Sequence, residues 1–191
     1  PGGLRGRGSS RLAKAFRPGL HPGRNKDLKV LKGIKLQDFE GAGDRFLVRC
    51  KQLSNGRGAL LALELVSPAG TVHYRAQAQM LENMSQPSRA AAPSLALDDW
   101  GGAPIYGDVL FHKDRFQVID KLDGVCDEGI SGTLKGVDKA EWGWERWNTD
   151  VAAMDGGLQL ILLWARNKMG GAVLPMGIGE MRISSTPPPQ G

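Results

Sequence analysis

The sequence predicts an α+β fold in which an antiparallel sheet wraps around one long, apolar helix. In the first half of the chain, short segments that alternate apolar and polar residues are separated by brief turns, which is typical of hairpins. In the second half, residues 152–168 are almost wholly apolar and too long for a strand. A helix that is apolar all round must be covered on several sides, and a surrounding sheet does this most economically.

Four strands are expected in the first half, after a short helix over residues 11–16 that a Pro-Gly pair ends. In the last of these strands, His73 alternates with apolar neighbours and is expected to point to solvent. Cys50 lies in a strand-like run and is expected to be a buried apolar side chain. The four strands are expected over residues 29–36, 45–51, 58–66 and 71–80.

The second half is expected to place two strands beside the helix. The aromatic-rich stretch 110–119 leads into a strand at 129–134, and a returning strand is expected over 174–183. The helix over 152–168 ends at a Gly-Gly pair. Few basic residues stand near a cluster of three tryptophans, so we expect core packing there and not nucleic-acid stacking. These tryptophans are Trp142, Trp144 and Trp147.

The formal net charge of +5 over 191 residues is concentrated at one end of the chain. Six of the 25 lysines and arginines fall within the first 24 residues, which contain no acidic residue. The remainder is nearly neutral, so the charge is weak support for a nucleic-acid partner, and a solvated basic linker is the simpler interpretation. No apolar run approaches the ~20 residues that span a bilayer, so no membrane is expected.

Cysteine usage and composition indicate a cytoplasmic protein with ordered blocks joined by linkers. Cys50 and Cys126 show neither metal-ligand spacing nor a Cys-x-x-Cys pair, which fits reduced thiols. The chain opens on Pro-Gly-Gly, so we expect a segment of a longer chain. The expected organisation is a linker at 1–10, an ordered block at 11–84, a linker at 85–104, an ordered block at 105–184 and a linker at 185–191.

The start of the apolar helix carries the candidate functional residues. Asp155 and Gln159 stand four residues apart, which places them on one face of a helix, one turn from each other. An ionisable group among apolar residues is costly to bury, so a carboxylate there indicates function. The structural alternative is that Asp155 is an acid near the start of a helix, favoured by the helix dipole.

Three motifs resemble one known family. The Asp155–Gln159 spacing fits an Asp-x-x-x-Gln/His motif in a long helix. Residues 110–117 read Leu-Phe-His-Lys-Asp-Arg-Phe-Gln and are similar to Leu-Phe-His-Gly-Pro-x-Phe-Gln, with Lys113 and Asp114 in place of Gly-Pro. Residues 174–178 resemble the strand that follows that helix. These motifs belong to the dehydratase domain of polyketide synthases and polyunsaturated fatty acid synthases, which the chain resembles over about residues 11–184.

The resemblance implies a double hotdog fold and a lyase of fatty acid or polyketide biosynthesis within a multidomain synthase. Residues 11–84 would be a partial N-terminal hotdog, and residues 105–184 the C-terminal hotdog. The activity would be loss of water from a 3-hydroxyacyl chain on an acyl carrier protein, giving the enoyl thioester. Asp155 would donate the proton, and Gln159 would hydrogen-bond either Asp155 or the substrate hydroxyl and fix its geometry. The resemblance gives substrate-binding roles to Phe111, His112, Phe116 and Pro175.

One departure separates this chain from the family. The family's second catalytic residue is the His of a His-x-x-x-Gly-x-x-x-x-Pro motif, and none of the three histidines here fits it. We therefore expect the His-bearing segment and most of the first helix to lie upstream in the parent chain, or to be lost. On that expectation, this chain alone is incomplete or inactive.

The resemblance also implies partners and leaves alternatives open. It implies no metal and no redox cofactor, and a substrate carried on the phosphopantetheine of an acyl carrier protein. Neighbouring synthase domains are the other expected partners, with no nucleic acid and no membrane, and homodimerisation is left open. A non-catalytic dehydratase-like domain with a structural or carrier-docking role is one alternative. A hotdog thioesterase, whose carboxylate activates water, is another.

Overall fold

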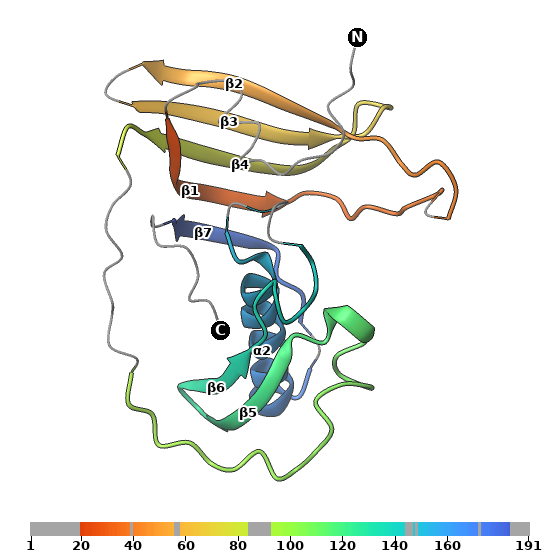
Figure 1. The fold of residues 1–191 in the computed structure, drawn as a ribbon, viewed down its shortest axis with the longest axis vertical. Helices are drawn as coiled ribbons and strands as arrows, with labels where there is room; N and C mark the ends of the chain where they lie inside the picture. The colour runs from red at the N-terminus through yellow and green to blue at the C-terminus, as the bar shows by residue number, and fades with distance from the viewer. Residues whose placement is uncertain are drawn as a thin grey trace. The chain divides into compact units, whose positions relative to one another are not determined.

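The computed structural model describes residues 20–38, 40–55, 58–83, 93–143, 147, 149–171 and 173–183 (Figure 1). The chain divides into two compact units, one formed by residues 1–87 with 176–186 and the other mainly by residues 88–175. The first unit is a sheet, and the second combines a long helix with a small sheet. The predicted α+β class is therefore confirmed.

A five-stranded antiparallel sheet forms the first unit, with strand order β2-β3-β4-β1-β7. The consecutive strands β2, β3 and β4 make the predicted meander, because apolar and polar residues alternate along them and short turns join them. Strand β1 pairs with β4, and β7, from the far end of the chain, pairs with β1. The bounds are His21–Val30 for β1, Leu47–Asn55 for β2, Gly58–Val66 for β3, Val72–Leu81 for β4 and Gly177–Arg182 for β7.

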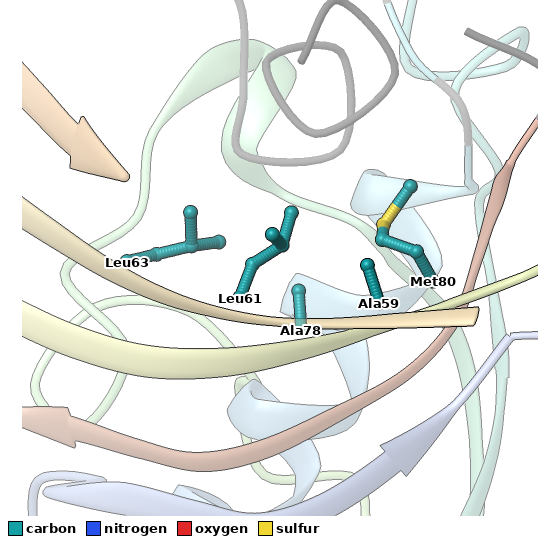
Figure 2. Close-up of a cluster of buried hydrophobic side chains, with 5 residues drawn as sticks. All are labelled: Ala59, Leu61, Leu63, Ala78 and Met80. Atoms are coloured by element: carbon teal, nitrogen blue, oxygen red, sulfur yellow. The ribbon is translucent and has the colours of Figure 1, made fainter. Parts of the chain in front are cut away.

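The core of this unit lies on one face of β3 and β4, where five side chains pack together (Figure 2). Leu61 and Met80 are fully buried. Cys50 packs against the cluster while only partly buried, and burial raises the pKa of its thiol. The cluster consists of Ala59, Leu61, Leu63, Ala78 and Met80.

The second unit packs helix α2 (Val151–Met169) against a hairpin of β5 (Ile119–Cys126) and β6 (Gly129–Leu134). A 3-10 turn, η1 (Asp114–Phe116), precedes β5. Leu110, Ile119 and Leu163 form a buried cluster between these elements. The helix ends at Gly170, whose φ of 71° is the left-handed conformation that glycine adopts without strain.

One predicted strand differs from the structure, one predicted helix is not tested, and one strand was not predicted. The strand expected over 29–36 is wrong, because β1 lies earlier and ends at Val30. Pairing with both β4 and β7 holds β1 extended despite its Pro-Gly and Asn residues, which favour turns. The short helix expected over 11–16 lies outside the described residues. Strand β5 follows the aromatic stretch and was not foreseen, because bulges interrupt its alternation.

One prediction about exposure was wrong. His73 is buried, with 8% of its surface exposed, because residues 32–33 fold over it and their carbonyl oxygens lie 3.0 and 3.2 Å from its Nδ1. Helix α2 is buried on more than one side but is partly exposed: Ala152, Gly156, Gln159 and Leu163 are buried along one side, Ala165 is buried on another, and Ile161 is 52% exposed. In the part of the chain that the structure describes, no helix is long and apolar enough to cross a membrane.

The tryptophan prediction holds for Trp142, which packs partly buried against a cluster that includes Val118 and Val137. Its indole N–H donates to the carbonyl of Arg115 at 3.1 Å. Trp147 is 37% exposed, and Trp144 lies outside the described residues.

The core predicts a large difference between two adjacent leucines of β3. Leu61→Ala should lower the free energy of unfolding by about 2–5 kcal/mol, because it opens a cavity under the sheet. Leu60→Ala, on the opposite and partly exposed face, should cost less than about 1.5 kcal/mol. Urea unfolding followed by far-ultraviolet circular dichroism measures both, and equal costs would contradict the assignment of the buried face.

Candidate functional site

Asp155 is the fifth residue of α2 and does not cap it. Asp150 is the N-cap, and its Oδ1 accepts from the backbone N–H of Ala153 at 2.8 Å and of Val137 at 3.2 Å. The first turn of α2 holds no acidic residue. Asp150 and not Asp155 therefore caps the helix, and the alternative that the helix dipole favours an acid near the helix start stays open.

Gln159 binds Asp155 and joins it to two other segments of the unit. The Gln159 side chain is 1% exposed. Its Nε2 donates to Oδ2 of Asp155 at 2.7 Å and to the carbonyl oxygen of Phe116 at 2.9 Å. Its Oε1 accepts from the hydroxyl of Tyr106 at 2.9 Å. Both hydrogens of this amide are therefore donated. If the amide were flipped, its oxygen would lie against the oxygens of Asp155 and Phe116, which cannot donate, so the orientation of the amide is fixed.

Tyr106 is a residue of this network that sequence reasoning missed. Its hydroxyl donates to Gln159 and accepts from the backbone N–H of Ile119 at 2.7 Å. Burial raises the pKa of the Tyr106 phenol, the nearby Asp155 carboxylate raises it further, and the Ile119 hydrogen bond opposes both. No spacing rule connects residues 53 positions apart, so only the fold brings this phenol to Gln159.

Gly156 lets α2 approach the hairpin at this point. A Cβ on Gly156 would lie 2.8 Å from a methyl carbon of Leu134 in β6, which is closer than carbon atoms pack. The residue beside Asp155 is therefore small because the helix and β6 are in close contact there.

Asp155 has one oxygen held and one open. Oδ2 accepts from Gln159, whereas Oδ1 accepts no hydrogen bond from a described residue. The side chain is half-buried. A carboxyl group with one fixed and one open oxygen can present a proton, or a lone pair, to a bound molecule in a defined direction.

The residues predicted to bind substrate are only partly joined to this network. The backbone carbonyl of Phe116 binds Gln159, and its ring is 57% exposed beside Trp142. Phe111 is 73% exposed and stacks on His112 with ring centroids 4.7 Å apart. Pro175 is exposed. No hydrogen bond or ring contact among the described residues joins Phe111, His112 or Pro175 to Asp155, so their roles stay predictions.

His112 has one feature of a binding residue. Its Nδ1 is buried and has no hydrogen-bond partner among the described residues. The Gln117 side chain donates to the His112 carbonyl at 3.2 Å, so two glutamines, Gln117 and Gln159, hold the segment around η1. A polar pocket of about 280 Å³ opens beside η1, lined by residues that include Arg115, Lys135 and Lys139, but Asp155 does not line it.

Within the described ranges, no group of three or more His, Cys, Asp or Glu side chains is placed to hold a metal ion. No protein-family model, curated protein or solved structure matches this chain. The site is therefore interpreted from its own geometry.

The network predicts the effect of removing one hydroxyl. Tyr106→Phe should lower the free energy of unfolding of the second unit by about 1–3 kcal/mol, because the Ile119 N–H and Gln159 Oε1 lose their partner. All five tryptophans lie at positions 100–164, so their fluorescence reports on this unit during urea unfolding. Tyr74→Phe is the matched control, with an expected effect within about 0.5 kcal/mol. Equal effects would refute the network.

The raised pKa of Tyr106 predicts a loss of stability at high pH. Folding favours the neutral phenol, so the contribution of Tyr106 to the free energy of unfolding is constant below the phenol's unfolded pKa of about 10. That contribution is lost as the pH rises through the higher pKa of the folded state. The difference in phenolate absorbance between the wild type and Tyr106→Phe isolates this group. It should titrate at higher pH in the folded protein than in urea, and the opposite order would contradict the geometry.

Proposed function

We propose that this chain forms part of a double hotdog dehydratase domain of a polyketide or polyunsaturated fatty acid synthase. Its reaction is the loss of water from a 3-hydroxyacyl chain carried on the phosphopantetheine of an acyl carrier protein. The observation that supports this most is the 2.7 Å hydrogen bond from Gln159 Nε2 to Asp155 Oδ2. It holds a half-buried carboxyl group on a long helix and leaves its second oxygen open.

The proposed reaction needs one base and one acid. The base removes a proton from C2 of the acyl chain, and those electrons form the C2–C3 double bond as the C3–O bond breaks. Asp155 donates a proton from Oδ1 to the departing hydroxyl, which leaves as water. A donor already oriented by a neighbouring amide avoids the cost of orienting it during the reaction.

Gln159 is a positioning residue in this proposal. Its amide hydrogens are both taken by protein oxygens, so the amide has no hydrogen left for substrate. Its bond to the Phe116 carbonyl connects the acid to the 110–117 segment, to which the family resemblance gives a substrate-binding role. The base is a histidine supplied from outside this chain.

A non-catalytic dehydratase-like domain is the second candidate. One observation favours it: no histidine among the described residues makes a hydrogen bond or an ion pair with Asp155. His73 is held by the carbonyl oxygens of residues 32–33, in the other unit.

The proposal predicts that Asp155→Asn abolishes dehydration by the intact parent protein. Conversion of a 3-hydroxyacyl-acyl carrier protein to the enoyl form is followed by mass spectrometry as loss of water. The rate should fall about 10²- to 10⁴-fold, the usual contribution of a general acid, while the folded structure is kept because Asn can still accept from Gln159. Asp99→Asn, at an exposed aspartate of the same unit, should leave the rate unchanged.

Other outcomes separate the alternatives. No water loss by the intact parent protein would support the non-catalytic domain. Release of free thiol from the same substrate, abolished by Asp155→Asn, would replace the dehydratase by a thioesterase. Full activity in Asp155→Asn would refute the role of Asp155 as the acid.

A further inference from the structure

The strand register of the first unit places basic side chains together on one face of the five-stranded sheet. Residues directly opposite each other in an antiparallel pair point to the same side. Across one row, Arg49 pairs with Glu64 and Glu64 with Arg75. In the next row, Lys51 pairs with Ala62, Ala62 with Gln77, Gln77 with Lys26 and Lys26 with Glu180. A third row pairs Leu60 with Gln79, Gln79 with Arg24 and Arg24 with Arg182.

This outer face is strongly basic, although the whole chain beyond its first residues is nearly neutral. It is the face opposite the buried cluster of Figure 2. Both of its carboxylates are already bound by arginines: Glu64 by Arg75 at 3.1 Å, and Glu180 by Arg182 at 2.6 Å. Lys26, Arg49 and Lys51 make no ion pair with a described residue. The basic residues that the register places on this face are Arg24, Lys26, Arg49, Lys51, Arg75 and Arg182, and the acidic ones are Glu64 and Glu180.

The charges form two rims with a neutral strip between them. Arg49 and Lys51 lie on β2, at one edge of the sheet, and the second rim lies on β1 and β7. Between the rims, β3 and β4 present half-buried residues without charge, except for the Glu64–Arg75 pair. These strip residues are Leu60, Ala62, Gln77 and Gln79.

The spacing of the rims matches the width of a helix. Strands β2 and β1 are three strand positions apart, which corresponds to about 14 Å. An α-helix with its side chains is about 10–12 Å across. A helix lying on the strip would place its two flanks beside the two rims.

We propose that this face binds an acidic amphipathic helix of a protein partner. The helix lies on Leu60, Ala62, Gln77 and Gln79 with a narrow uncharged stripe, and carboxylates on both of its flanks meet the rims. Charge complementarity supplies orientation and a fast association rate, and the strip supplies the apolar contact. The surface belongs to the first unit alone, so the proposal does not depend on the role of Asp155.

Nucleic acid is a poorer fit to the same surface. The strip has no aromatic side chain among its described residues, so it offers no platform for base stacking. Duplex DNA is therefore the alternative ligand that the experiment includes.

The test uses an alanine-based helical peptide of about 20 residues, with glutamates on both flanks of an alanine stripe. A scrambled peptide of the same composition, a DNA duplex and vesicles of anionic lipid are the comparison probes. Fluorescence anisotropy with the full chain should give a dissociation constant for the patterned peptide at least about tenfold lower than for the scrambled one. Binding should weaken as salt rises, since the contacts are ionic.

Two variants test whether binding depends on the rims and the strip or only on the net charge of the chain. Reversing one charge on each rim, Lys26→Glu with Lys51→Glu, should weaken binding of the patterned peptide at least about tenfold. The control, Lys113→Glu with Lys139→Glu in the other unit, changes net charge equally and should have less than about a threefold effect. Ala62→Phe keeps the charge but obstructs the strip, and it should weaken the patterned peptide while DNA binding stays unchanged.

The proposal is overturned by any of three results. Equal affinity for the patterned and scrambled peptides would show a response to charge alone. Equal effects of the two charge-reversal pairs would show that the rims have no special role. Tighter binding of duplex DNA or of anionic vesicles than of the patterned peptide would assign the face to that other class of ligand. Circular dichroism of each variant checks that the chain is still folded. The Ala62→Phe variant tests the strip without reversing any charge.

Discussion

The second unit depends on one constraint: a buried glutamine amide must satisfy each of its polar atoms within the protein. Gln159 is 1% exposed, and leaving any of its groups unpaired there costs about 1–3 kcal/mol. Its three partners come from the helix, from η1 and from Tyr106, which in turn binds the first residue of β5. The same amide therefore fixes the orientation of Asp155 and the path of the segment before β5.

Local pattern was enough to predict β3, β4 and α2: β4 alternates apolar and polar residues, β3 is a short apolar run between turns, and α2 is an apolar run too long for a strand. It failed for β1, where a Pro-Gly pair is held extended by pairing with two distant strands. It also failed for His73, because the segment that covers it comes from 40 residues away. At the candidate site, the Asp155–Gln159 contact follows from a spacing of four, whereas Tyr106 and the Phe116 carbonyl reach Gln159 only through the fold.

The two units carry different chemistry. The second presents a carboxyl group with one bound oxygen and one open oxygen, which suits proton transfer. The first presents a basic face with a neutral strip, which suits recognition of an acidic helix. Each proposal rests on contacts within its own unit, so either can fail without the other.

The side-chain amide of Gln159 is the most direct place to test the constraint. Hydrogen exchange of its two Nε2 protons, followed by nuclear magnetic resonance, reports on both donated bonds at once. Both protons should exchange slowly in the wild type, and Asp155→Ala should accelerate exchange of the one bound to Oδ2. Fast exchange of both protons in the folded wild type, as in an exposed glutamine, would contradict the network and remove the support it gives to Asp155.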